Sequence, residues 1–174
     1  YSLGSVTNEQ GRRYELLGRV EIVLAPNESF SYSPSAPVVA SPLMLDSLAK
    51  LPIGAVRVAS DTSGNQVAVT ADFVTKLASI KHLQQLDLWS VSLDRPAIVA
   101  IAALPSLKTL SIVESFIADD IRSSWGYDLA QAKCFRVIEH LNIHYLEPTE
   151  PVIDALAKAK HIQGLTLVDS PLSA

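Results

Sequence analysis

The stretch Leu83-Gln84-Gln85-Leu86-Asp87-Leu88 decides the fold, because its pattern returns three more times along the chain. The spacing L-x-x-L-x-L recurs, with Ile at some positions, at residues 107–112, 138–143 and 162–167. Each copy follows a short apolar segment with the three- and four-residue spacing of an amphipathic helix. Self-similarity of this kind is typical of solenoids, in which a unit buries its apolar face only against its neighbours. The sequence therefore predicts stacked helix–strand units.

The spacing of the strands sets the length of each unit. The first apolar strand residue falls at positions 56, 86, 110, 141 and 165, so the steps are 30, 24, 31 and 24 residues. The two longer steps need inserted turns, at residues 60–66 and 118–126, and the run Asp61-Thr62-Ser63-Gly64-Asn65 has a suitable turn composition. Ser41, followed by Pro42, and Thr70 are placed to cap two of the helices, and the next unit is expected to start at Asp94. Residues 42–174 are thus predicted to form about five units.

Residues 1–41 do not fit the repeat and are predicted to form an N-terminal cap that contains β-structure. Residues 19–25 have the apolar pattern of a strand, and Phe30 and Tyr32 alternate with serines, so a β-hairpin is expected there. Residues 33–42 are rich in proline and serine and are predicted to be an extended connection.

Composition and charge limit the classes of function. Of the 174 residues, 48% are hydrophobic and 18% are charged, which favours a folded domain with a substantial core. The net charge is −4 and the basic residues are scattered, so we expect no nucleic-acid binding. No run approaches the roughly 18 apolar residues of a membrane span, so we expect no membrane insertion by this segment. The single cysteine, Cys134, excludes an internal disulfide and is interpreted as a small buried hydrophobe.

The L-x-x-L-x-L strands that follow helices resemble the leucine-rich repeat family, in particular its irregular bacterial members, over about residues 42–172. The resemblance implies an α/β right-handed solenoid, with parallel strands on a concave face and helices outside. The family motif continues to an asparagine or cysteine that satisfies the backbone at the corner. Val91, Ser115, Leu146 and Ser170 take that position here, so the corners are expected to satisfy their backbone groups by other means.

Alternate residues of a strand point to the same face, so the inward leucines leave a second set of residues pointing outward. Stacking of the units would bring this set into lateral rows on the concave face and its adjoining loops. The rows contain the expected binding residues: Gln85, Asp87, Trp89, Ser111, Val113, Glu114, His140, Asn142, His144, Tyr145, Thr166 and Asp169.

Trp89 is the strongest candidate anchor of this set, because tryptophan and tyrosine are enriched at binding hot spots. Two interpretations are open. Either Trp89 contacts a partner together with His144 and Tyr145, or the N-terminal segment covers it through Phe30 or Tyr32.

Metal and catalytic chemistry have less support. His140 and His144 lie four residues apart on one strand, roughly 13 Å, which is too far for one zinc ion. Glu114 and Asp169 are expected about 9.6 Å apart, near the carboxylate separation of inverting glycosidases, but the spacing alone defines no pocket. The sequence contains no nucleophile-elbow, phosphate-loop or dinucleotide motif. We expect no metal, no cofactor and no enzymatic activity, with a hydrolase as a remote alternative.

The favoured function is therefore a non-enzymatic module that binds a protein or peptide through the concave face and its loops. The alternative is a structural domain of a larger, membrane-anchored bacterial protein that self-associates. It rests on the last repeat, which reaches Ala174 with no polar cap and so predicts either a longer native chain or contact with a second copy. The chain begins at Tyr1 rather than with Met, so a targeting segment can have been removed and the compartment, cytoplasm or envelope, stays open.

Overall fold

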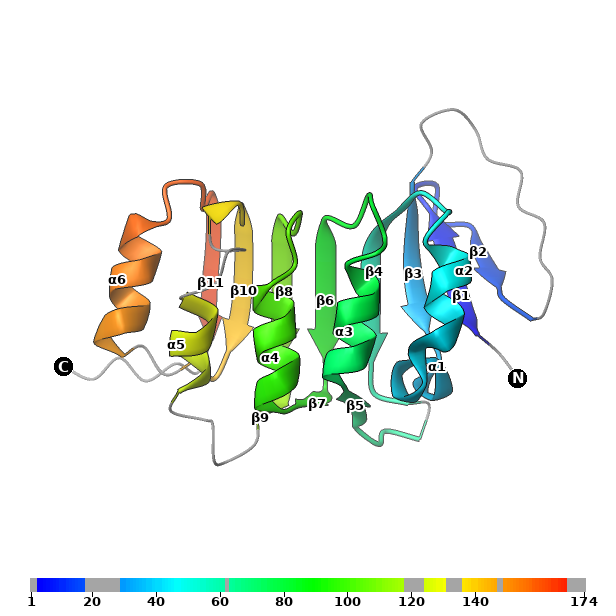
Figure 1. Ribbon diagram of the computed structural model, residues 1–174, viewed down its shortest axis with the longest axis horizontal. Coiled ribbons are helices and arrows are strands. Elements are labelled where there is room, and N and C mark those ends of the chain that lie inside the picture. The colour runs from blue at the N-terminus through cyan, green and yellow to red at the C-terminus, as the bar shows by residue number, and fades with distance from the viewer. Residues whose placement is uncertain are drawn as a thin grey trace.

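The computed structural model describes residues 3–17, 29–61, 63–117, 124–130, 136–146 and 149–168. They form a mixed α/β structure built on a large, mostly parallel sheet (Figure 1). The strands of this sheet are β1 (Gly4–Asn8), β2 (Arg13–Glu15), β3 (Phe30–Pro34), β4 (Ile53–Ala59), β6 (Gln85–Trp89), β8 (Thr109–Val113), β10 (His140–His144) and β11 (Gly164–Val168). Their order across the sheet is β11-β10-β8-β6-β4-β3-β1-β2.

The described helices lie on one side of this sheet, in front of it in Figure 1. They are α1 (Ala36–Ala40), η1 (Pro42–Met44), α2 (Leu45–Leu48), α3 (Ala71–Leu77), α4 (Arg95–Ala102), α5 (Trp125–Ala130) and α6 (Glu150–Lys158). The predicted cap at Thr70 is confirmed, since Thr70 accepts a hydrogen bond from Phe73 N–H at 3.2 Å. Ser41 precedes η1, but its side chain makes no capping bond, so that prediction is wrong. Asp94, at the predicted start of the next unit, accepts a hydrogen bond from Ala97 N–H at 2.8 Å. Within the described ranges, no helix has the length and apolar character needed to cross a membrane.

The parallel strands pair in the register that the repeat predicts. Leu86 lies opposite Val56 on one side and opposite Leu110 on the other. Leu110 in turn lies opposite Leu141, and Leu141 opposite Leu165. Equivalent leucines of successive repeats therefore form one row across the sheet, as stacked units require.

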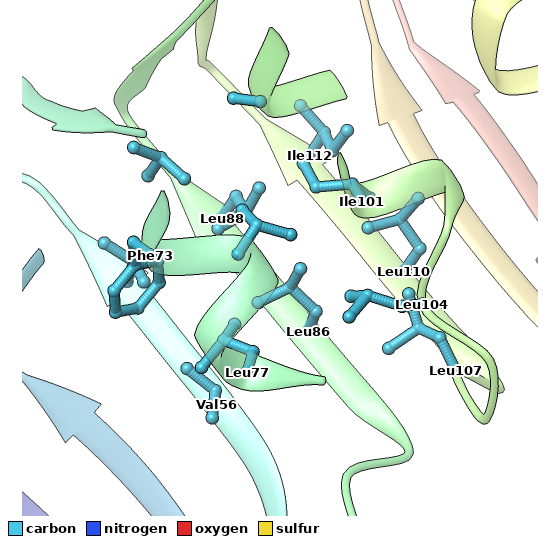
Figure 2. Close-up of a cluster of buried hydrophobic side chains, with 14 of the residues drawn as sticks. Val56, Phe73, Leu77, Leu86, Leu88, Ile101, Leu104, Leu107, Leu110 and Ile112 are labelled. Carbon is cyan, nitrogen blue, oxygen red and sulfur yellow. The ribbon is translucent and has the colours of Figure 1, made fainter. Parts of the chain in front are cut away.

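This row, together with the next inward row, faces the helices and makes the core. Figure 2 shows Leu86 and Leu88 of β6 near Leu110 and Ile112 of β8, with Phe73 and Leu77 of α3 and Ile101 of α4 close to them. All four strand residues are at most 1% exposed. The core therefore lies between the sheet and the helices, and the opposite face of the sheet is left for polar side chains.

At its N-terminal end the sheet continues beyond the predicted repeats. β3 pairs in parallel with β4, with Tyr32 opposite Val56, and β1 then pairs antiparallel with both β3 and β2. The predicted alternation is confirmed, since Phe30 and Tyr32 are buried. One continuous core runs from Val6 to Val152, so the N-terminal strands and the repeats share it.

Two predictions for the N-terminal segment have different outcomes. The predicted strand at residues 19–25 lies outside the described residues. The prediction that residues 33–42 are extended is wrong, because α1 and the start of η1 occupy that stretch. Pro37 stands in the first turn of α1, where its missing N–H costs nothing, and Val38 and Val39 are buried. Burial of two valines therefore outweighs the local preference for an extended chain.

The chain turns sharply after each strand, and the turns repeat. Ser90, Glu114 and Tyr145 each follow a strand and have φ of 51°, 50° and 60°. Such left-handed backbone is uncommon outside glycine. The amide of Ser90 donates to the carbonyl oxygen of Val113 at 3.0 Å, and that of Tyr145 donates to the carbonyl oxygen of Val168 at 2.9 Å. The expectation that the corners satisfy their backbone groups without an asparagine row is confirmed at these two corners.

At the corner after β8, a serine takes part in the bonding. The buried Ser115 hydroxyl lies 3.0 Å from the carbonyl oxygen of Val113 and 3.4 Å from that of Leu88, and it accepts from Val91 N–H at 3.5 Å. It thus joins the corner to the preceding repeat. A second sheet, with parallel pairing, is formed by β5 (Val67–Val69), β7 (Val91–Leu93) and β9 (Phe116–Ile117).

We expect Ser115→Ala to lower the free energy of unfolding by about 1–3 kcal/mol, because it leaves buried backbone groups at the corner without a side-chain partner. Urea denaturation measures this loss. Ser92→Ala, at a half-buried serine of β7, is the matched control and should change stability by less than about 0.5 kcal/mol. Equal losses in the two variants would show that the Ser115 bonds are not needed at the corner.

The buried hydroxyl of Tyr32 should make the protein less stable at alkaline pH. Its hydroxyl donates to the carbonyl oxygen of Leu3 at 2.7 Å, and burial raises the pKa of Tyr32. A raised folded-state pKa means that this stability is fully present below the unfolded pKa of about 10 and is lost as the pH rises above it. Tyr32→Phe should cost about 0.5–1.5 kcal/mol at neutral pH and reduce the alkaline loss. Tyr14→Phe is the control, and identical alkaline profiles for the two variants would contradict this role of Tyr32.

Candidate functional site

The candidate site lies on the face of the large sheet that points away from the helices, which we call the open face. The residues that alternate with the buried leucines lie on it, as predicted. β6 contributes Gln85, Asp87 and Trp89, β8 contributes Ser111 and Val113, β10 contributes His140, Asn142 and His144, and β11 contributes Thr166. Glu114 and Tyr145 follow β8 and β10 directly, and both are exposed. Asp169 and Cys134 lie outside the described residues.

A row of polar contacts crosses the middle of the open face. Arg57 Nε donates to Asp87 Oδ2 at 3.1 Å, and Gln85 Nε2 donates to the same oxygen at 2.8 Å. On the neighbouring strands, Asn142 Nδ2 donates to Ser111 Oγ at 3.1 Å. These bonds tie β4 to β6 and β8 to β10, so they hold the side chains of the face in place.

Arg57 is the part of this row that the sequence analysis did not predict. It lies on β4 directly opposite Asp87, and its side chain is 59% exposed. The repeat is degenerate in β4, where valines replace leucines, so the pattern did not identify the outward-facing residues of that strand. Applying the same alternation to residues 55–59 would have found it.

Trp89 is exposed on the open face, with 57% of its surface accessible. Its indole Nε1 donates a hydrogen bond to Glu114 Oε2 at 3.0 Å, so the corner after β8 fixes the edge of the ring. The interpretation that Phe30 or Tyr32 covers Trp89 is wrong, because both side chains are buried in the core, at 3% and 0% exposed.

The carboxyl ends of the parallel strands border a groove of 1160 Å³ on this face. Its lining includes these predicted site residues: Asp87, Trp89, Ser111, Val113, Glu114, Asn142 and His144. The N-terminal strands and α1 add a wall that the sequence analysis did not predict, formed by residues that include Gly4, Arg13, Glu15, Pro34 and Pro37. The groove is therefore shared between the repeats and the N-terminal strands.

The remaining predicted residues lie elsewhere. Gln85 borders a second hollow of 640 Å³ near the amino ends of the strands, with Lys108 and Glu139, which form an ion pair at 2.9 Å. His140, Tyr145 and Thr166 line neither hollow. The structure thus brings together most of the predicted set at one end of the open face.

Asp61 is held at the rim of the groove by its own loop. Its carboxylate accepts hydrogen bonds from the Asn65 side chain at 3.0 Å and from the amides of Asn65 and Ser63 at 2.8 and 2.9 Å. The side-chain bond from Asn65, then its amide bond, holds the pKa of Asp61 below its usual value. Asp61 therefore presents a stable negative charge beside the groove.

The described residues place no three His, Cys, Asp or Glu side chains where they could share a metal ion. The groove is lined by the exposed indole of Trp89, the half-buried apolar side chain of Val113 and several hydrogen-bonding side chains. Glu114 is bonded to the Trp89 indole, and its expected carboxylate neighbour, Asp169, is outside the described residues. These groups can bind an occupant by stacking, hydrogen bonds and charge.

The fold and this face define a mixed α/β protein whose mostly parallel sheet carries helices on one side and a grooved open face on the other. No known protein family matches the sequence, and neither a curated protein nor a solved structure matches the chain.

Proposed function

We propose that this chain is a leucine-rich-repeat-like right-handed solenoid that binds a protein or peptide, without catalysis, through its open face and adjoining loops. The in-register leucine rows and the recurring left-handed corners support the solenoid. In this proposal the open face is the concave surface of the solenoid, as in the family that the repeats resemble. The helices then have a structural role and cover the core.

Exposure of Trp89 within the groove is the observation that carries the binding function. A tryptophan that served only stability would be expected in the core, as Trp125 is with 0% exposed. Trp89 instead keeps 57% of its surface accessible, and its bond to Glu114 limits the motion of the ring. A large ring that is already oriented loses little entropy on binding, which makes it an effective anchor.

Selection from a random peptide library displayed on phage tests this proposal. The library is selected on the wild-type protein, and the enriched peptides are then measured against two variants. Trp89→Ala should weaken their binding by about tenfold or more, as at a binding hot spot. Phe116→Ala removes another exposed aromatic ring, which is 44% accessible and lies outside the groove lining, and should leave binding unchanged. Enriched peptides that bind equally well to Trp89→Ala would contradict the proposed site.

Self-association is the second candidate, and the last described strand favours it. Leu165 on β11 is 46% exposed, although its equivalents Leu86, Leu110 and Leu141 are buried. β11 is also the last strand in the order of the described sheet and so lies at one of its edges, where strands of another copy can pair. If this edge associates with a second copy, the mass in solution should rise with concentration and Leu165→Lys should keep the protein monomeric. A constant monomer mass would exclude this candidate.

A further inference from the structure

The charges of the described side chains that line the groove do not cancel. Two of these side chains are arginines, and both have partners. Arg13 Nε lies 2.9 Å from Glu15 Oε1, and Arg57 Nε lies 3.1 Å from Asp87 Oδ2. No lysine is among the described residues of the lining. The basic groups of the groove are therefore neutralised by the groove itself.

Two carboxylates of the lining have no such cation. Among the described residues, Glu114 bonds to the neutral Trp89 indole, and Asp61 bonds within its own loop. In the described part of the chain, neither forms an ion pair with a lysine or arginine. With His144 counted as neutral, the described residues of the lining carry two more negative than positive charges.

The position of Glu114 matters for the chemistry of the occupant. Its carboxylate lies at the N–H edge of Trp89, while the ring keeps 57% of its surface exposed. The face of an indole ring attracts cations through its quadrupole, and a carboxylate at the edge adds to that attraction. An apolar occupant would instead remove water from Glu114 with no compensating charge, which is unfavourable.

We infer that the occupant of the groove is an extended peptide segment with a lysine or arginine side chain, whose cation lies on Trp89 beside Glu114. Apolar neighbours of that residue would contact Val113 and Pro37, which also line the groove. This inference rests on the proposed function and adds the chemistry of the partner. An acidic segment is disfavoured, because the uncompensated carboxylates would repel it.

The composition of the selected peptides tests this inference separately from the proposed function. Peptides that require Trp89 should be richer in Lys and Arg, and poorer in Asp and Glu, than the starting library. Selection of Trp89-dependent peptides without this enrichment would overturn the inference and leave the proposed function standing. If no peptide requires Trp89, both fail.

Affinities of one selected basic peptide then locate its cation. Glu114→Gln keeps an oxygen that can accept the indole N–H but removes the charge, so it should raise the Kd roughly two- to fivefold. Replacing the basic residue of the peptide by glutamine should make wild type and Glu114→Gln bind equally. Glu150→Gln is the matched control, since Glu150 is an exposed residue of α6 outside the groove lining, and it should leave the Kd unchanged. An equal Kd for wild type and Glu114→Gln with the basic peptide would overturn the inference.

Discussion

Replacement of Leu110 by alanine is expected to lower the free energy of unfolding by about 2–5 kcal/mol, which is a large part of the roughly 5–15 kcal/mol that stabilises a typical domain. Leu110 is 0% exposed and occupies the centre of the leucine row, between Leu86 and Leu141. Truncation there removes apolar contacts and leaves a cavity between the sheet and α4. Neighbouring strands on both sides limit how far the structure can relax into that cavity.

Leu165→Ala is the matched control for this prediction. Leu165 takes the same position in its repeat and lies directly opposite Leu141, but 46% of it is exposed. Less apolar surface is buried there, so the same truncation should cost less than about 1.5 kcal/mol. Urea denaturation of both variants gives the comparison. Similar losses at the two positions would contradict the account of burial along the row.

Gly4→Ala is expected to destabilise the protein by at least about 2–3 kcal/mol, although it adds only one methyl group. Gly4 has φ of 112°, a region that residues with a side chain rarely adopt. An alanine Cβ would also overlap with the carbonyl oxygen of Ser33 and lie 2.8 Å from Pro34 Cα. Both are backbone atoms of β3, so removing the overlap requires β1 to move away from β3.

Two other glycines separate these effects. Gly11 has φ of 78° but open space around the added Cβ, so Gly11→Ala should show only the backbone strain of about 1–2 kcal/mol. At Gly54 the added Cβ would meet Ser29 Cβ at an ordinary 3.6 Å, and Gly54→Ala should be close to neutral. A loss at Gly4 no greater than that at Gly11 would show that the approach of β1 to β3 is not as close as described.

The repeat predicted the middle strands and their pairing because the same pattern recurs in each unit and neighbouring units stack in register. The alternation in β6 and β8 specified which residues are buried, and the stacking of identical patterns specified the register. The N-terminal part was harder to predict. β1 pairs with β3 across more than twenty residues of chain, and nothing in the local pattern of Gly4–Asn8 specifies that partner.

For the site, the outward set was predictable but its grouping was not. Alternation placed Asp87, Trp89 and Val113 on one face. The wall from the N-terminal strands depends on the long-range pairing of β1, so the sequence analysis missed Arg13 and Pro37. The Trp89–Glu114 bond was not predictable either, because it joins residues 25 positions apart and Glu114 lies at a corner with left-handed φ.

The most direct test of the central claim is acrylamide quenching of tryptophan fluorescence, with and without a selected peptide. The chain has two tryptophans, and only Trp89 is exposed, because Trp125 is 0% accessible. Quenching of the free protein therefore reports Trp89. We predict that a saturating peptide protects Trp89 and lowers the quenching constant toward that of buried tryptophan. A peptide that saturates the protein and leaves the quenching constant unchanged would show that the open face is not the binding surface.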